Sequence, residues 1–252
     1  MPQLLLLGTG AGLTDGSREP TMLALRGSTG STVLIDCGSN PVRQLQRLGV
    51  PLDSIDRLIL THSHPDHTAG LPLLVEQLWL AGRRKPLPIH GPEDALNVME
   101  RVMLSWDLSS WKGLFELEWQ VVPLSMHAPI AHTDDFALTA APGVHSVPVI
   151  GVRARDLQNG GTVAYSADGE ASGGIRELAQ GVDLLVHEAN GPFKGHCLAR
   201  DAAELARTAG ARRLVLVHLS PQRPEFDAEY QAAKDVFDGE LSLGMDLERY
   251  EF

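Results

Sequence analysis

The segment Thr61–His67 constrains the fold most, because it places three histidines and one aspartate within six consecutive positions. It follows the apolar run Leu58–Leu60, which predicts a buried strand. In an extended backbone His62 and His64 project to the same side, since side chains alternate with a period of two. Pro65 then predicts a turn that directs the next two side chains to a second position nearby. Histidines this dense after a core strand have little packing purpose, so the segment predicts two neighbouring metal sites rather than a solvated loop.

The rest of the chain predicts two sheets with helices outside them. Runs rich in β-branched residues or leucine, bounded by Gly, Pro or Asp, predict strands at 4–7, 33–36, 58–61, 87–90, 119–124, 136–140, 149–153, 162–166, 184–187 and 214–218. Helical spacing of apolar residues predicts helices at 41–48, 70–80, 93–106, 174–179, 197–209 and 227–237. Strands dominate the middle of the chain and helices are interspersed on both sides. We therefore expect an α/β fold in one domain spanning residues 1–252, with each sheet covered on its outer face by helices.

Composition narrows the class of protein further. A chain of 252 residues is long enough to bury a sizeable core. The net charge of -11 argues against broad, non-specific nucleic-acid binding, although a local basic patch stays compatible with it. Cys37 and Cys197 read as reduced thiols of a cytoplasmic protein. The start reads as a core strand rather than a signal peptide, and no apolar run is long enough to span a membrane.

Polar residues fall at the carboxyl ends of five predicted strands. These are Asp36, His62, Asp168, His187 and His218. Ligands of α/β proteins collect at such ends, so the five positions predict one shared cleft. We read His187 as a strand-end histidine with a structural hydrogen bond and assign it no role in the reaction.

Two metal ions need about six to seven protein ligands, more than one loop supplies. His145 follows a predicted strand and a glycine turn, and Asp168 offers a carboxylate that can bridge two ions. His218 completes the set. His127 and His132 are alternatives to His145, but their polar surroundings favour a surface loop or the rim of the cleft.

The pattern His62-x-His64-x-Asp66-His67, followed in order by the three later ligands, resembles the metallo-β-lactamase superfamily along essentially the whole chain. The resemblance implies a four-layer αβ/βα sandwich with a dinuclear site between the sheets. The ions are usually zinc, and manganese and iron are alternatives because mixed histidine and carboxylate sites accept several divalent cations.

Carried over by position, the family's ligands divide into two sets. One ion would be held by His62, His64 and His145, the other by Asp66, His67 and His218, with Asp168 bridging them. Asp66 would also orient the attacking water or accept its proton, and Asp36 would hold the ligand loop by hydrogen bonds.

Within the superfamily the chain is most similar to ribonuclease Z and related phosphodiesterases. The similarity rests on Leu7–Gly10, Leu185–Ala189 and Gly195–Cys197. It implies that His196 protonates the leaving oxygen while Glu188 orients it, a role that suits a phosphodiester because its alkoxide is a poor leaving group. Cys197 stands where that group usually has serine.

The sequence departs from ribonuclease Z where that enzyme carries its long RNA-binding arm. Here residues 146–167 accommodate only two strands and the turn at 159–161. We therefore expect a phosphodiesterase acting on small or cyclic phosphodiesters. The alternatives are a tRNA 3′-end endoribonuclease, a lactone or thioester hydrolase using the same metals, and a non-enzymatic protein that is either a metal-stabilised scaffold or a cofactor-pathway carrier. RNA is the less favoured partner, a homodimer is implied only by the resemblance, and the basic cluster Arg83–Lys85 reads as a solvated turn.

Overall fold

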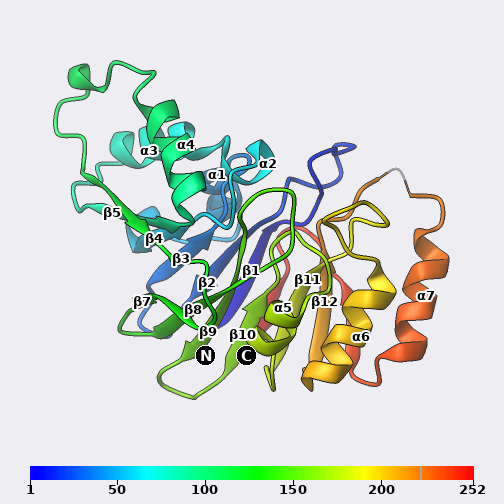
Figure 1. Cartoon of the computed structure of the whole chain (residues 1–252). Coiled ribbons are helices and arrows are strands. Elements are labelled where there is room, and N and C mark those ends of the chain that lie inside the picture. The colour runs from blue at the N-terminus through cyan, green and yellow to red at the C-terminus, as the bar shows by residue number, and fades with distance from the viewer. Residues whose placement is uncertain (222) are drawn as a thin grey trace.

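Two seven-stranded sheets pack face to face in the computed structural model, which describes residues 1–221 and 223–252 (Figure 1). The first sheet has the order β14-β1-β2-β3-β4-β5-β6, with strands Arg249–Glu251, Gln3–Gly8, Met22–Arg26, Thr32–Ile35, Ile55–Ile59, Leu87–Gly91 and Leu117–Val121. The second has the order β13-β12-β11-β10-β9-β8-β7, with strands Glu240–Leu243, Arg213–Val217, Leu184–Glu188, Thr162–Tyr165, Ile150–Asp156, Phe136–Pro142 and Ala128–His132. The expected two-sheet α/β sandwich is confirmed.

Both sheets are mixed. In the first, β3 to β6 run parallel and β14 to β3 are antiparallel. In the second, β10 to β13 run parallel and β7 to β10 are antiparallel. The parallel strands of each sheet bring several carboxyl ends to one edge, which is where α/β proteins bind ligands.

Three apolar layers hold this arrangement together. The central layer lies between the sheets and includes Leu6, Phe136 and Tyr165. A second layer joins the first sheet to α1 (Pro41–Arg47), α3 (Leu71–Leu80) and α4 (Glu93–Met103). A third joins the other sheet to α5 (Gly173–Leu178), α6 (Ala199–Ala209) and α7 (Phe226–Val236). Removal of this apolar surface from water is the main force that stabilises the sandwich.

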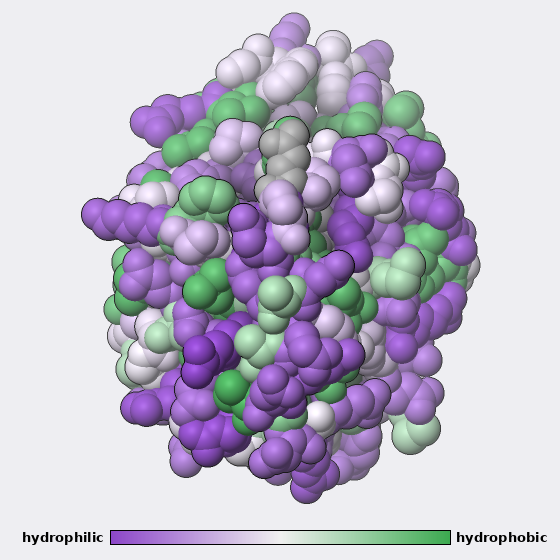
Figure 2. Space-filling model, turned by 90° about the vertical axis from the view of Figure 1, so that its right-hand side faces the viewer, coloured by the Kyte–Doolittle hydropathy of each residue, from purple (hydrophilic) through white to green (hydrophobic). Residues whose placement is uncertain are grey.

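Helix α6 shows how the sequence produces an outer layer. Its buried residues are mostly alanines at helical spacing, which lets the helix lie close to the sheet, and its charged residues face outward. It ends at Gly210, whose φ of 71° is the left-handed conformation typical of a helix C-terminus. The face on the α7 side of the molecule is accordingly mostly hydrophilic, with only scattered hydrophobic residues (Figure 2).

Among the described residues, the structure adds four strands and one short α-helix that the sequence pattern did not predict. Strands β7, β13 and β14 are edge strands, and β7 contains Pro129, which a strand tolerates only at an edge or bulge. Strand β2 has the sequence MLALR, whose leucine, alanine and methionine favour helices, yet its neighbours on both sides hold it in the sheet. At Pro65, where a turn was predicted, the chain forms the short helix α2 (Pro65–Thr68), because the fixed φ of proline also suits a first helical position.

Two further expectations concern an RNA-binding arm and membrane-spanning helices. Residues 146–167 contain only β9, β10 and the short connection between them, so an arm is absent from this described interval. Among the residues that the structure describes, no helix has the length and apolar character to cross a membrane.

Candidate metal centre

Four of the five predicted strand-end residues converge at one edge of the sandwich, whereas the fifth, His187, lies within β11 (Leu184–Glu188) and outside the candidate donor groups. Asp36 follows β3, His62 follows β4, Asp168 follows β10 and His218 follows β12. Asp36, Ala167 and His218 have φ values of 62°, 55° and 55°, in the left-handed region that side chains with a Cβ rarely adopt. Such strain persists only where the surrounding structure enforces it, and it is commonly found at functional sites.

The seven predicted ligands form two groups that share Asp168. One group consists of His62, His64, His145 and Asp168, the other of Asp66, His67, Asp168 and His218, and within each group the donor atoms lie within 4.8 Å of one another. Asp168 Oδ2 lies 3.0 Å from His218 Nε2 and 3.9 Å from His62 Nε2, and its Oδ1 lies 3.3 Å from His67 Nε2. Asp168 is therefore placed between the groups, as a bridging carboxylate must be.

Most of the histidines have one ring nitrogen held from outside the centre. The Nδ1 atom of His67 lies 2.8 Å from Asp36 Oδ2, and that of His145 lies 2.6 Å from the Gly195 carbonyl oxygen. The Nδ1 atom of His62 lies 3.0 Å from Thr61 Oγ1, and that of His218 lies 3.3 Å from Thr21 Oγ1. This fixes the ring orientation and leaves Nε2 of each of the four facing the centre, an arrangement that metal-binding histidines require.

The donor set fits divalent cations. His62 Nε2, His67 Nε2 and Asp168 Oδ1 are buried and have no hydrogen-bond partner, a costly state unless another group satisfies them. Burial, followed by the nearby histidines, lowers the pKa of His62 and His64, so these imidazoles are neutral and offer lone pairs. His64 Nδ1 and His145 Nε2 lie only 3.1 Å apart, which suits two lone pairs directed at one cation.

Asp36 anchors the histidine-rich loop, as expected. Its fully buried carboxylate accepts hydrogen bonds from the backbone N–H of Thr61 at 2.8 Å, from the Thr61 hydroxyl at 2.9 Å and from His67 Nδ1. Burial lowers the pKa of His67, but the negative charges of Asp168 and Asp36 and the hydrogen bond to Asp36 outweigh it and leave that pKa well above its usual range.

Two glycines bring backbone against Asp66. A Cβ at Gly38 would lie 1.6 Å from the carbonyl oxygen of Asp66, and a Cβ at Gly12 would lie 2.9 Å from its Oδ2. The overlap at Gly38 is with main chain, so that position excludes a side chain, whereas a side chain at Gly12 would require the Asp66 carboxylate to shift.

His196 and Glu188 form a pair beside these groups. Glu188 is fully buried, and its Oε1 accepts from His196 Nδ1 at 2.8 Å and from the backbone N–H of Gly169 at 2.9 Å. Burial lowers the pKa of His196, but the hydrogen bond and charge of Glu188 outweigh it, so the pKa is raised. Because Gly169 directly follows Asp168, the Glu188 carboxylate orients both the loop that carries Asp168 and the His196 ring.

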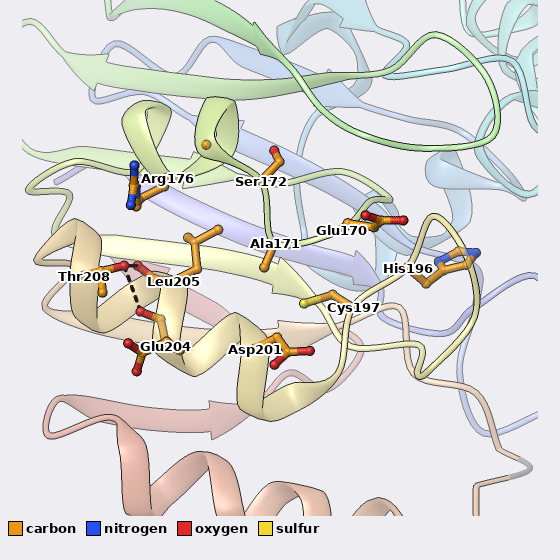
Figure 3. Close-up of a pocket in the computed structure, with 11 residues that line it drawn as sticks. Glu170, Ala171, Ser172, Arg176, His196, Cys197, Asp201, Glu204, Leu205 and Thr208 are labelled. Atoms are coloured by element: carbon orange, nitrogen blue, oxygen red, sulfur yellow. Dashed lines mark hydrogen bonds between the residues drawn. The ribbon is translucent and has the colours of Figure 1, made fainter.

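Two cavities meet at His196. The first, of about 340 Å³, lies over the donor groups and is lined by Ala11, Gly12, Leu13, His64, Asp66, Asp168, Asn190, Phe193, His196, His218 and Ser220. The second, of about 660 Å³, runs between α5 and α6 (Figure 3). Its charged lining consists of Glu170, Asp201 and Glu204 opposed by Arg176.

The remaining histidines and the basic cluster lie elsewhere. His127 is exposed and lies 2.8 Å from Glu177, and His132 ends strand β7 instead of lying in a loop; neither belongs to the two donor groups. His187 is buried and bonded through Nδ1 to a backbone carbonyl. Arg83 donates to three backbone carbonyls at 2.6–3.0 Å, so its guanidinium stabilises the turn rather than facing solvent.

Several residues at the centre were missed by sequence reasoning. Thr21 precedes the unpredicted strand β2 and Gly12 lies in an exposed loop, so no local pattern marks either one. Leu13 and Phe193 are exposed apolar residues of loops, and only the folded chain shows that both line the cleft.

The two-sheet sandwich and the donor groups at its edge define a hydrolase of the metallo-β-lactamase fold. This fold implies that the protein binds divalent metal ions. A family model described as "Beta-lactamase superfamily domain" matches residues 31–219, and the chain belongs to this family.

Known proteins agree with this assignment. Ribonuclease Z of Methanothermobacter thermautotrophicus is 29% identical, with 94% of this chain and 92% of that protein covered. The crystal structure of the short form of human tRNase Z superposes with a TM-score of 0.80 at 26% identity and covers 99% of this chain and 98% of its own. The metallo-β-lactamase fold protein YhfI from Bacillus subtilis gives a TM-score of 0.82 at 24% identity, with 100% and 99% covered.

Proposed function

We propose that this protein is a dinuclear, zinc-dependent phosphodiesterase that hydrolyses small or cyclic phosphodiesters. The observation that carries the proposal is the His196–Glu188 pair, whose His196 lines the same cavity as members of both donor groups. A proton donor beside a metal centre is needed when the leaving group is an alkoxide and is dispensable for a better leaving group.

In this proposal each side chain has a defined part. Seven residues hold the ions: His62, His64, Asp66, His67, His145, Asp168 and His218. Two bound divalent ions would generate a hydroxide nucleophile from water near neutral pH and would neutralise charge on the phosphoryl oxygens. Asp66, which is partly exposed at the cleft, orients the attacking water. His196 donates its proton to the leaving oxygen, and Glu188 stabilises the imidazolium by its hydrogen bond to Nδ1.

The charges around the centre support a small substrate rather than a long RNA. The cavity beyond His196 is lined by Glu170 next to His196, by Asp201 farther along and by Arg176 at its far end (Figure 3). Glu204 is paired with Arg207. A polyanionic strand in this cavity would pass the carboxylates of Glu170 and Asp201, whereas a short diester need not enter it.

A tRNA 3′-end endoribonuclease is the second candidate, because the relatives named Ribonuclease Z cover nearly the whole chain. It would have to hold RNA by a surface other than an arm between β9 and β10.

A panel of substrates tests the proposal. Protein loaded with zinc and checked for metal content would be assayed on bis(p-nitrophenyl) phosphate, on p-nitrophenyl acetate and on a precursor tRNA resolved on a gel. We expect turnover of the diester that disappears on chelation and returns with zinc. Absence of diester turnover by the fully metallated protein would refute the proposal. Cleavage of the precursor after the discriminator base would favour the endoribonuclease, and turnover of the acyl ester alone would favour a lactone or thioester hydrolase.

A further inference from the structure

We propose that Phe193 is a specificity-determining residue whose ring stacks on a planar heteroaromatic base carried by the leaving half of the substrate. This inference rests on the proposed phosphodiesterase function and adds the chemical class of the leaving group. It starts from an exposed phenylalanine at the mouth of the metal cleft.

The turn that carries Phe193 is firmly attached to the centre. The backbone N–H of His196 donates to the Phe193 carbonyl at 3.0 Å, which closes a tight turn over residues 193–196. Gly195 within this turn donates its N–H to Glu170 at 3.1 Å and accepts from His145 Nδ1 at 2.6 Å. A Cβ at Gly195 would lie 3.1 Å from His145 Nδ1, so the turn packs directly on that ring. The position of the Phe193 backbone relative to His196 is thus fixed by the centre itself.

The Phe193 side chain is largely exposed and lies outside the apolar layers of the described structure. Its exposed fraction is 59%, although it lines the cavity over the donor groups. No ring contact joins it to another aromatic residue in the part of the chain that the structure describes, and it belongs to none of the three apolar layers. Leu13, with an exposed fraction of 53%, lines the same cavity from the loop after β1. Single exposed apolar residues are common, but ligand clefts are typically lined by apolar and aromatic side chains, so the place of these two at the cleft makes them candidates for contact with a ligand.

The location assigns Phe193 to the leaving half. His196 donates its proton to the leaving oxygen in the proposed reaction, so the group attached to that oxygen lies beside His196, and Phe193 is held in the same turn. Leu13 adjoins Gly12, which packs against Asp66 on another wall of the cavity. A phenyl ring offers a planar base a stacking surface without reading its hydrogen-bonding edge, so we expect preference for a base but little preference among bases.

Two matched substrates test this assignment. One is a dinucleoside monophosphate. The other has the same reacting phosphodiester, but its leaving half is the sugar without a base. We expect the zinc-loaded protein to favour the substrate with the complete leaving nucleoside by about tenfold or more in kcat/KM, the size expected for loss of one base stack. Phe193→Ala should bring this ratio close to one, chiefly through KM, since stacking contributes equally before and during the reaction. Phe193→Tyr should keep the ratio.

Controls separate the inference from its alternatives. Zinc binding by Phe193→Ala, measured by calorimetry, should match the unaltered protein, because the turn's contacts are made by backbone. Trp106→Ala removes another aromatic side chain, with an exposed fraction of 50% and lining a different cavity, and should leave the ratio unchanged. Equal rates of the unaltered protein on both substrates, or an equal loss on both in Phe193→Ala, would overturn the stacking role while phosphodiesterase activity stands. Absence of turnover of either substrate by the zinc-loaded protein would overturn both proposals.

Discussion

Replacement of Asp36 by asparagine is expected to weaken one of the two metal sites without a change in side-chain volume. The carboxylate receives three donors: the Thr61 N–H at Oδ1, and the Thr61 hydroxyl and His67 Nδ1 at Oδ2. An amide has one acceptor oxygen and one NH₂ donor. The orientation that keeps the backbone hydrogen bond of Thr61 turns the NH₂ toward His67. The ring must then accept at Nδ1 and carry its proton at Nε2, on the side of the centre.

The size of the effect follows from that change of tautomer. A proton on Nε2 removes the lone pair that His67 would direct at a cation, and loss of such an orienting partner typically costs about 10- to 100-fold in metal affinity. This corresponds to about 1.4–2.7 kcal/mol. Only the group of Asp66, His67, Asp168 and His218 contains this histidine, so the other group should keep its affinity.

Competition titrations with a zinc chelator would resolve the two sites. We expect one zinc equivalent to bind normally and the second to be weakened by the stated factor in Asp36→Asn. Asp135→Asn is a matched control, since Asp135 is also fully buried and accepts from the side chains of Thr29 and Ser31. It should lower the free energy of unfolding and leave zinc affinity unchanged. Normal affinity at both sites in Asp36→Asn, or an equal loss in the control, would refute the reasoning.

Three further outcomes are expected. Gly38→Ala should abolish zinc binding or fold poorly, because its Cβ would lie 1.6 Å from the Asp66 carbonyl oxygen, whereas Gly173→Ala, with no atom within 4 Å, should bind zinc normally in the same titration. Burial raises the pKa of Asp135, but hydrogen bonds led by Ser31 outweigh it and lower that pKa, so its stabilising effect is present above about pH 4 and is lost as the pH falls through the folded-state pKa. Urea unfolding should therefore show a gap between the unaltered protein and Asp135→Asn that narrows below about pH 4, and a constant gap would contradict this. Arg83→Lys should lower the free energy of unfolding by about 1–3 kcal/mol, since lysine cannot reach all three carbonyls; an unchanged urea midpoint would show that these contacts add no stability.

The sequence predicted the sandwich and the centre to different extents. The central strands were predictable because each is a short apolar run that ends in a polar residue, and their order led to two sheets. Strands β7 and β14 were not, because edge strands are held by one neighbour and need little local preference. Thr21 and Phe193 act through contacts made only after folding, so neither position carries a pattern that predicts its role.

The density of histidines in residues 61–67 made the first members of the candidate donor groups predictable, and the later members followed from strand ends and from the family's order. The orienting contacts show a different kind of limit. That the Gly195 carbonyl holds His145, or that Glu188 joins His196 to the loop after Asp168, depends on distances between segments far apart in sequence. Periodicity and composition carry no information on such distances.

The dependence of rate on the leaving group tests the central claim most directly. The measurement is kcat/KM for two phosphodiesters that differ only in the leaving group, which is p-nitrophenolate in one and an alkoxide in the other. Both are assayed with the zinc-loaded unaltered protein and with zinc-loaded His196→Ala. General acid catalysis contributes about 10²- to 10⁴-fold where the leaving group needs a proton. We expect His196→Ala to lose about 100-fold or more in kcat/KM on the alkyl ester and little on the nitrophenyl ester, with zinc content unchanged. An equal loss on both esters, or none on the alkyl ester, would contradict this expectation.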